Sequence, residues 1–184
     1  MKFVPTELPG VVVVEPAVHR DARGFFLETF SVPKYAEGGI RDTFVQDNHS
    51  RSQQGTLRGL HAQVTRPQAK LLRTVKGEIF DVAVDIRRGS PHFGRWTGVV
   101  LSADNFRQLY IPAGFAHGFC VLSEVAEVEY KCSDVYVPSD EITIAWNDPA
   151  IGIQWPIASP LLSKRDEAGE PLAAMGDRLP VYRG

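Results

Sequence analysis

The sequence predicts an all-β fold of the sandwich or barrel type, and two observations lead to this prediction. Apolar residues alternate with polar ones at a period of two, rather than about 3.6, along most of the chain. Turn-forming residues recur about every eight to twelve positions, which is typical of the short strands of sandwiches and barrels. Helix signals are few, so only short helices are expected.

The expected strands are short runs rich in β-branched and aromatic residues, each bounded by turn-forming residues. In chain order they are Val11–Glu15, Phe25–Phe30, Phe44–Ser50, Thr56–His61, Lys70–Lys76, Glu78–Ile86, Trp96–Ser102, Gln108–Ile111, Gly118–Leu122, Ala126–Lys131 and Ile142–Trp146. One or two helical turns are expected at Val32–Glu37, and another helix after Leu161. The absence of repeats and linkers predicts a single domain over residues 1–184, and the tail from about Ser163, where alternation is lost, is expected to wrap the surface.

Composition argues against several classes of function. The 184 residues are 43% hydrophobic with a formal net charge of -2, without a membrane-length apolar run or a basic run that would bind nucleic acid. The short apolar run Val11–Val14 lacks the flanks of a signal peptide, so we expect a cytoplasmic protein. Cys120 and Cys132 lie in apolar-rich segments, which favours reduced core thiols over a disulfide or a zinc ligand set.

The strand Glu78–Ile86 has two chemically different faces. Phe80, Val82, Val84 and Ile86 share one face, and Ile79, Asp81, Ala83 and Asp85 share the other. The second face is expected either to be solvated or to line a polar cavity of the kind that small barrels enclose.

A cluster of polar side chains lies on two neighbouring predicted strands. Gln46 and Asn48 are on the first strand, and Arg58 and His61 are on the second. Such side chains need hydrogen-bond partners when buried, and a polar ligand can supply them. Arg58 and His61 would face opposite ways on a regular strand, so a shared pocket requires a bulge, which Gly59 would tolerate.

The segment Tyr110–Gly118 contains Pro112, Gly114 and His117. This Pro-x-Gly-x-x-His pattern resembles the second motif of the cupin superfamily, in which a turn delivers a His into a barrel. The first cupin motif normally supplies His-x-His and a Glu as metal ligands, but here Gln63 stands at the second His position. Two imidazoles without a carboxylate fall short of the three ligands that a catalytic metal usually takes. We therefore expect a cupin-like double-stranded β-helix, a jelly-roll barrel, without a metal or another cofactor.

Most of the chain, from Asp21 to about Asp166, resembles the dTDP-4-dehydrorhamnose 3,5-epimerase family. Eight motifs match in the family's order, which makes a chance similarity implausible. They are Asp21–Phe30, Val45–Ser50, Leu57–His61, Gly77–Asp85, Ile111–Phe119, Tyr130–Lys131, Trp146–Pro149 and Leu162–Asp166.

The resemblance implies roles for four residues in the epimerisation of a 4-keto sugar through an enolate. His61 matches the family's base, which is suitable because an imidazole accepts a proton near neutral pH. Asp166 matches the carboxylate that orients the base, and Tyr130 matches the acid on the opposite face of the sugar. Lys70 matches a cation beside the C4 oxygen, where negative charge develops. The implied reaction converts dTDP-4-dehydro-6-deoxy-D-glucose to dTDP-4-dehydro-L-rhamnose.

The resemblance also implies a substrate-binding set. Arg23 and Arg58 match positions that hold the diphosphate, for which guanidinium forks are suited. The other matching positions, from the thymidine end and the rest of the pocket, are Phe26, Glu28, Gln46, Asn48, His117, Tyr136, Glu141 and Arg165. In the family the Arg23–Glu28 segment comes from a neighbouring subunit, which implies a homodimer with composite sites.

Without the resemblance, each of these residues also has a structural explanation. His61 could be a satisfied core or surface histidine, Tyr130 a packing residue, Lys70 a solvated cation and Asp166 a helix cap. Likewise, Phe25 and Phe26 could be core, and Arg23 could simply pair with Asp21.

Three positions depart from the family pattern: Ala62 where an aromatic is common, Arg165 where Lys is common, and His92 where Thr is usual. Ala62 removes bulk beside the expected base and could change the shape of the pocket. The alternatives are therefore a single-site epimerase of a modified deoxysugar, a non-catalytic nucleotide-sugar-binding cupin, and a related 3,4-ketoisomerase. A binder needs no paired acid and base, and the motifs at Asp47–Ser50 and Leu162–Asp166 resemble the epimerase branch rather than the ketoisomerase.

Overall fold

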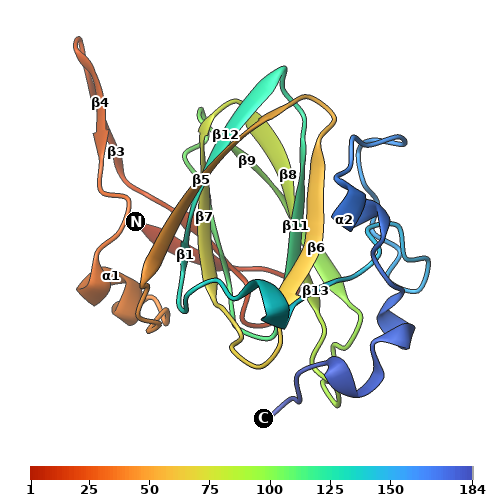
Figure 1. Ribbon diagram of the computed structural model, residues 1–184. Helices are drawn as coiled ribbons and strands as arrows, with labels where there is room; N and C mark the ends of the chain where they lie inside the picture. The colour runs from red at the N-terminus through yellow and green to blue at the C-terminus, as the bar shows by residue number, and fades with distance from the viewer. Residues whose placement is uncertain (184) are drawn as a thin grey trace.

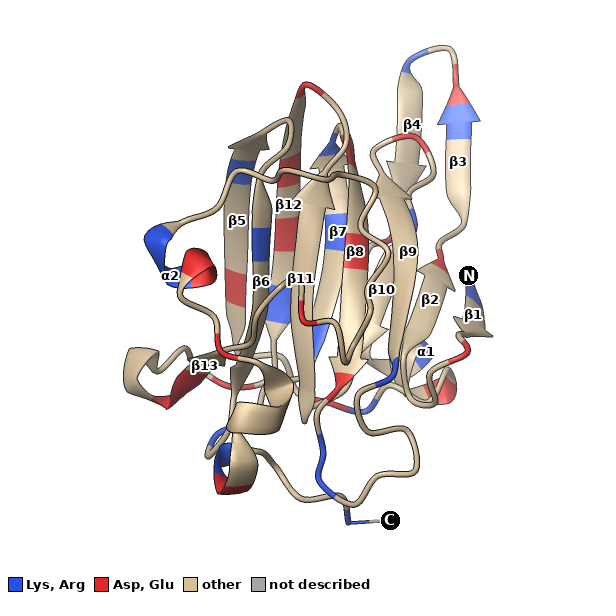
Figure 2. Ribbon diagram, turned by 90° about the vertical axis from the view of Figure 1, so that its right-hand side faces the viewer, with Lys and Arg blue, Asp and Glu red and all other residues tan. Residues whose placement is uncertain are grey.

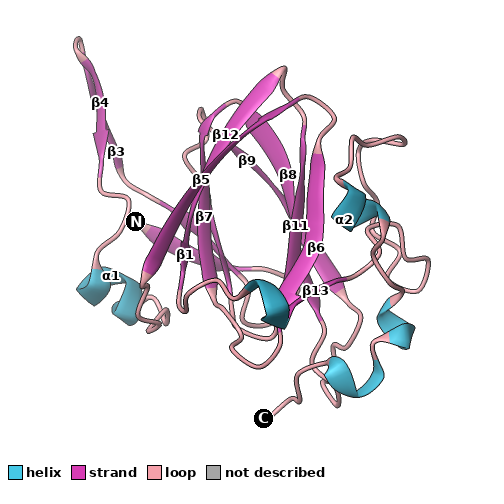
Figure 3. Ribbon diagram, in the orientation of Figure 1, coloured by secondary structure: helices cyan, strands magenta, loops and turns pink. Residues whose placement is uncertain are grey.

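The computed structural model describes residues 1–183 and confirms the all-β, cupin-like fold. Two antiparallel sheets face each other and enclose a barrel, with short helices and loops at its edges (Figures 1 and 3). The first sheet has the order β1 (Lys2–Pro5), β2 (Val12–Glu15), β10 (Gln108–Ile111), β7 (Lys70–Lys76), β12 (Val125–Cys132) and β5 (Gln46–Gln53). The second has the order β13 (Glu141–Thr143), β6 (Leu57–Gln63), β11 (Phe115–Val121), β8 (Glu78–Asp85) and β9 (Trp96–Ser102).

The remaining elements lie outside the two sheets. Strands β3 (Val18–Asp21) and β4 (Gly24–Leu27) form a separate hairpin that projects from the barrel (Figures 1 and 2). The helices and 3-10 turns are α1 (Val32–Glu37), η1 (Pro138–Asp140), α2 (Lys164–Glu167), η2 (Leu172–Ala174) and η3 (Gly176–Arg178). No helix in the part of the chain that the structure describes is long and apolar enough to cross a membrane.

Most expected strands form, with two kinds of error. Strands β1 and β3 were not expected, because both are short and mainly exposed, so neither shows an apolar face. The expected strand Phe25–Phe30 ends at Leu27, where the chain leaves the hairpin. The expected strand Ile142–Trp146 is instead Glu141–Thr143, followed by a bridge from Ile144 to Glu170.

Three apolar clusters hold the fold together. The largest lies between the sheets and includes Leu72, Ile79 and Val128. A second lies behind β6, β11 and β8, where Leu172 and Met175 of the C-terminal segment cover the sheet. The third lies beneath α1 on the outer side of the first sheet and is described by Tyr35, Ile40, Leu71 and their neighbours. The second cluster fixes the C-terminal segment against the strand that carries His61.

The strand β8 resolves the choice that its alternation left open. Phe80 and Val82 pack in the cluster behind the sheet, whereas Ile79 and Ala83 pack in the barrel interior. Asp81, on the interior face, has no exposed surface. The face that carries the carboxylates is therefore inside the barrel and is not solvated.

Candidate active site

A cavity of about 430 Å³ opens between the two sheets, a size suited to a small-molecule ligand. It is lined by Gln46, Asn48, Ser50, Arg58, His61, Gln68, Lys70, His117, Phe119, Tyr130, Cys132, Tyr136, Glu141, Ser163, Arg165 and Asp166. The first sheet supplies Lys70 and Tyr130, and the second supplies His61 and His117. All four expected catalytic residues, and seven of the expected binding residues, therefore meet in one place.

A bulge in β6 brings Arg58 and His61 to the same cavity. His61 lies opposite His117 of β11 and Arg58 lies opposite Phe119, so the pairing register shifts between them. Gly59 has a φ of +134°, and a Cβ there would lie 2.5 Å from the Cα of Gly118. The bulge expected from the sequence is present, and its glycine has both the unusual φ and no room for a side chain.

His61 is held by a buried carboxylate. Its Nε2 lies 2.6 Å from Oδ1 of Asp166, which is 4% exposed. The Ser163 hydroxyl donates to Oδ2 of Asp166 at 2.7 Å and also accepts from the Asp166 backbone N–H, so Ser163 is the cap of α2. Burial opposes ionisation of Asp166, but the hydrogen bonds from His61 and Ser163 together lower its pKa. Asp166 therefore carries a negative charge beside the imidazole.

The other nitrogen of His61 is the one available to a ligand. Nδ1 lies 3.9 Å from Oε1 of Glu141, beyond hydrogen-bonding distance, and the side chain keeps 23% of its surface exposed. Because Nε2 donates to the carboxylate, Nδ1 carries the free lone pair in the neutral ring. The arrangement orients His61 as a base.

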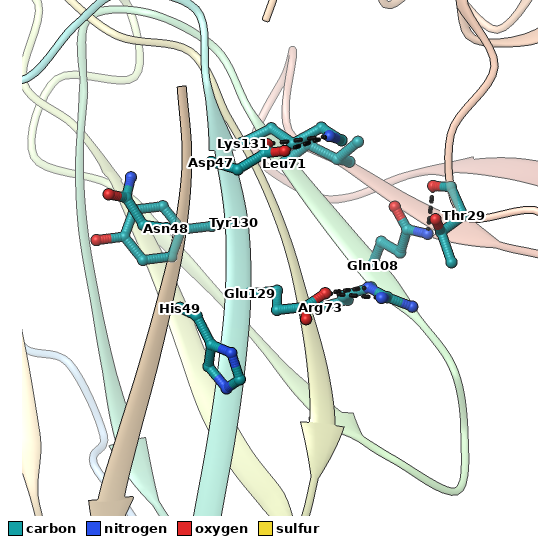
Figure 4. A pocket seen from close by; sticks show the side chains of 10 residues that line it. All are labelled: Thr29, Asp47, Asn48, His49, Leu71, Arg73, Gln108, Glu129, Tyr130 and Lys131. Carbon is teal, nitrogen blue, oxygen red and sulfur yellow. Dashed lines mark hydrogen bonds and ion pairs between the residues drawn. The ribbon is translucent and has the colours of Figure 1, made fainter. Parts of the chain in front are cut away.

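Lys70 and Tyr130 lie on the opposite wall, on neighbouring strands of the first sheet. Figure 4 shows the Tyr130 and Asn48 side chains on the inner side of this sheet, away from Arg73 and Glu129. Burial raises the pKa of Tyr130 and lowers the pKa of Lys70, because it disfavours the charged form of each. Within residues 1–183 neither side chain donates a hydrogen bond to a protein group, so both donors are free to meet a ligand.

A second His–carboxylate pair lies deeper in the cavity. Nε2 of His117 is 3.0 and 3.1 Å from the two carboxylate oxygens of Asp81. Burial lowers the pKa of His117, although Asp81 opposes this effect. Asp81 was not among the expected site residues, but the alternation of β8 had already placed it on the interior face.

A polar network stands near His61 at one side of the cavity. The Tyr136 hydroxyl donates to Oε2 of Glu141 at 2.9 Å, and the Arg165 guanidinium donates to the Tyr136 oxygen at 3.1 Å and pairs with Glu141. The backbone N–H of Tyr136 donates to Oε1 of Gln46 at 2.9 Å, and the Gln46 amide donates to Asn48 at 3.1 Å. These five residues were all expected in the binding set.

Further lining residues were not expected from the sequence: Ser50, Gln68, Phe119, Cys132 and Ser163. Ser163 had a usable signal, since a Ser three residues before an acidic residue is a helix N-terminus pattern. Cys132 lies in the cavity wall, where the Asn48 amide donates to its sulfur at 3.6 Å. The other three carry no pattern that distinguishes them from ordinary strand residues.

Gln63, at the cupin metal-ligand position, points away from the cavity. Its amide donates to the backbone oxygens of Arg66 and Val135, and its Oε1 accepts from the N–H of Val137. Across residues 1–183 there is no group of three or more His, Cys, Asp or Glu side chains placed to hold a metal ion.

Three expected binding residues lie outside the cavity of their own chain. Arg23 is on the hairpin turn and pairs with Asp21 at 2.5 Å, and Glu28 pairs with Lys34 at 2.9 Å. Phe26 is 71% exposed, so core packing is not its role. Together with Phe3 and other residues, Phe26 and Glu28 line a separate groove.

Another hollow, of about 280 Å³, lies on the outer side of the first sheet (Figure 4). Its charged groups neutralise one another: Arg73 pairs with Glu129 at 2.7 Å and Lys131 with Asp47 at 3.0 Å. The paired charges make this hollow a poorer candidate for a polar ligand than the cavity that contains His61.

Comparison with known proteins identifies the family. The family model described as dTDP-4-dehydrorhamnose 3,5-epimerase matches residues 5–174. A Neisseria gonorrhoeae protein of that name is 56% identical over 94% of this chain, which spans only 53% of that relative's length. A Pseudomonas aeruginosa protein of the same name is 53% identical over 94% of this chain and 97% of its own.

The structural comparison agrees with the sequence comparison. A crystal structure of dTDP-6-deoxy-D-glucose-3,5-epimerase from Legionella pneumophila, in complex with dTDP-4-keto-L-rhamnose, superposes with a TM-score of 0.97. The two chains share 48% identity, and the match covers 100% of this chain and 99% of the other. The chain therefore belongs to the dTDP-4-dehydrorhamnose 3,5-epimerase family.

Proposed function

We propose that this chain epimerises dTDP-4-dehydro-6-deoxy-D-glucose at C3 and C5, giving dTDP-4-dehydro-L-rhamnose. The observation that carries the proposal is the cavity in which the His61–Asp166 pair faces Lys70 and Tyr130 across the barrel. One wall then holds an oriented base, and the other holds a hydroxyl and a cation that no protein group occupies.

In the proposed mechanism His61 removes the proton from the carbon beside the C4 carbonyl, and the C–H electron pair moves into the ring as an enolate. Lys70 stabilises the negative charge that collects on the C4 oxygen, as an oriented donor in a site with little water does. Tyr130 returns a proton to the carbon from the opposite face, which inverts the centre, and the phenolate regains its proton from solvent. The raised pKa of Tyr130 keeps its hydroxyl protonated at neutral pH, as this role requires.

Both centres can be inverted by the same residues, because C3 and C5 flank the same carbonyl and are acidified by it equally. Arg58 and Arg165, the two guanidinium groups that line the cavity, are proposed to bind the diphosphate. Tyr136, which is 43% exposed, offers an aromatic face for the base of the nucleotide.

We further propose that the chain acts as a homodimer with composite sites. Arg23, Phe26 and Glu28 belong to the expected binding set but lie on or below a projecting hairpin, outside their own cavity. A second copy gives these residues a cavity to complete. We also propose that the chain is a single catalytic domain, since Ser163 and Asp166 of its C-terminal segment line the same cavity as the strands.

No metal is proposed for the reaction, because the cupin ligand position is filled by a Gln63 side chain that is committed to backbone groups. A cytoplasmic location is proposed from Cys120 and Cys132, which are both free and buried in the reduced form.

The decisive experiment is incubation with dTDP-4-dehydro-6-deoxy-D-glucose in deuterated water, followed by proton NMR. We expect deuterium at C3 and C5 and the L-rhamnose configuration in the product, whereas His61→Ala produces neither. Label at one carbon only would instead identify a single-site epimerase. A carbonyl that moves from C4 to C3 would identify a ketoisomerase, and binding without exchange would identify a non-catalytic protein.

The composite site is tested by mixing two defective variants. His61→Ala loses the base, and Arg23→Ala loses the arm that reaches into the partner's cavity. In a mixed dimer, the cavity of the Arg23→Ala chain receives an intact hairpin from the His61→Ala chain, so one complete site is restored. Activity at low substrate that exceeds the sum of the separate variants supports the composite site, and simple additivity contradicts it.

A further inference from the structure

Phe106, in the loop between β9 and β10, has an unusual backbone conformation. Its φ is +57°, and it is the only residue other than glycine with a positive φ in the described part of the chain. Bulky L-residues avoid this region because the Cβ approaches the backbone, and Gly or Asn is the usual occupant. A phenylalanine there costs stability, so a contact made by its ring is expected to compensate.

The loop holds Phe106 in this conformation by hydrogen bonds on both sides. The Phe106 N–H donates to the Ser102 carbonyl at 3.2 Å. The Asn105 side-chain oxygen accepts from the N–H groups of Ser102 and Arg107 at 3.1 and 2.9 Å, and the Asn105 N–H donates to the Ser102 hydroxyl at 3.0 Å. The direction of the ring is therefore determined by the loop itself.

The ring of Phe106 is directed at the hairpin. Its centroid lies 4.8 Å from that of Phe25, at an interplanar angle of 66°. The guanidinium carbon of Arg20 lies 5.1 Å from the Phe106 centroid and 6.0 Å from that of Phe25. These three side chains, from β3, β4 and the β9–β10 loop, form an aromatic–cation cluster that we call the hairpin anchor.

The hairpin has few other supports along its outer part. Residues 19–26 are all exposed, and the two strands pair only with each other (Figure 1). Neighbouring side chains on a strand point to opposite faces, so the contact of Phe25 with Phe106 leaves Phe26 directed away from its own barrel. Phe26 is accordingly the more exposed of the two, at 71% against 57%.

We propose that Phe106 is a positioning residue for the substrate site: through Phe25 and Arg20 it fixes the direction of the hairpin, and so the place where Arg23 and Phe26 meet the nucleotide bound by a second copy. This inference rests on the composite site proposed above. Phe106 touches neither substrate nor reacting atoms in this scheme. Its effect is to limit the orientations of the hairpin before binding, so that less order has to be imposed when substrate binds.

The test replaces Phe106 by Asn, which tolerates the positive φ but lacks the ring. We expect KM for the dTDP-sugar to rise roughly three- to tenfold, since aromatic and cation–π contacts of this kind have modest individual strength. The turnover number kcat is expected to stay within about twofold, because the chemistry at the sugar is not touched. Phe106→Tyr retains the ring and is expected to restore KM. Phe93→Asn, which removes a 43% exposed aromatic from another loop, is the matched control and is expected to leave KM unchanged.

A nitroxide label on an Ala22→Cys variant reports the hairpin directly, because Ala22 lies at its exposed turn and both native cysteines are buried. Its spectrum is expected to show greater mobility after Phe106→Asn and no change after Phe93→Asn. The effect of Phe106→Asn on KM is also expected to vanish when Phe25 is already Ala, since the anchor is then broken.

The inference is overturned if Phe106→Asn leaves either KM or the mobility of the label at its original value. Arg23→Ala separates this outcome from a failure of the composite site. If Arg23→Ala raises KM and Phe106→Asn does not, only the role of Phe106 is wrong. If Arg23→Ala has no effect either, the hairpin takes no part in binding and the composite site itself is wrong.

Discussion

Replacing Asp166 by Asn tests whether the buried carboxylate assists the base. The substitution keeps the shape of the side chain and one accepting oxygen, but it removes the negative charge 2.6 Å from Nε2 of His61. In the proposed mechanism that charge stabilises the imidazolium that forms as His61 takes the substrate proton. We therefore expect kcat to fall and KM to change little.

The size of the effect follows from the geometry. Asp166 is 4% exposed and the His61 side chain 23%, so the pair is largely shielded from water. Opposite charges about 4 Å apart attract by about 4 kcal/mol at an effective dielectric constant of about 20. An Asn dipole keeps part of this stabilisation, which leaves a loss of about 3 to 4 kcal/mol in the transition state. At 1.36 kcal/mol for each factor of ten, kcat is expected to fall by roughly 150- to 900-fold.

Ser163→Ala is the matched control, because it removes one hydrogen bond to the same carboxylate and leaves the charge in place. A neutral hydrogen bond contributes about 1 kcal/mol, so this variant is expected to lose less than about tenfold in kcat. Rates of product formation and of deuterium exchange are measured for both variants, with circular dichroism to establish that each is folded. A folded Asp166→Asn enzyme with kcat within about threefold of the original would show that the carboxylate only caps α2, and the reasoning would be refuted.

Four other predictions follow from the same cavity. Tyr130→Phe is expected to exchange deuterium into the substrate while forming little inverted product, and inversion at the original rate would remove Tyr130 from the mechanism. The lowered pKa of Lys70 means that its charge is lost as pH rises, at a value below the ordinary 10.5; the alkaline fall in rate should therefore move to higher pH in Lys70→Arg, and an unmoved profile would assign it to another group. The lowered pKa of Asp166 means that it stabilises the fold at neutral pH and that this contribution is lost as pH falls below 3.8; denaturant titrations should show a flatter acid limb for Asp166→Asn, and an unchanged limb would contradict the shift. Exhaustive chelation is expected to leave turnover unchanged, and a loss that zinc, manganese or iron reverses would show that a metal takes part.

Strand alternation was sufficient to predict the interior side of the barrel. Lys70 and Tyr130 occupy alternate positions on strands whose opposite faces carry exposed charges, and they lie in the cavity as expected. The bulge between Arg58 and His61 was also predictable, because two polar residues three positions apart can share a pocket only if the strand is irregular. Period and turn chemistry contain this information locally.

The remainder depends on contacts that local patterns do not encode. Asp166 reaches His61 across 105 positions in the sequence, from a segment without alternation, and only the packing of the C-terminal segment behind β6 brings them together. Without the family resemblance its carboxylate would read as a helix cap. The pairing of Asp81 with His117 likewise needs the register of β8 against β11, which the sequence does not give. The hairpin residues are harder still, since the proposed cavity for Arg23 belongs to another molecule.

Ala62 illustrates how the structure changes an argument made from the sequence. Its position next to His61 suggested a gap beside the base, and hence a reason to suspect epimerisation at one carbon only. Ala62 is instead 4% exposed in the cluster behind β6, on the face opposite the cavity, where Ile144 and Leu172 belong to the same cluster. The missing bulk is taken up by the C-terminal segment, and the space above His61 is bounded by residues that match the family, including His117 and Tyr130. Since C3 and C5 flank one carbonyl, inversion at both needs room for the sugar to shift against a single base, and Ala62 neither adds nor removes that room. The departure at position 62 therefore gives no reason to expect a single-site enzyme, and label at both carbons remains the expected result for the unmodified protein.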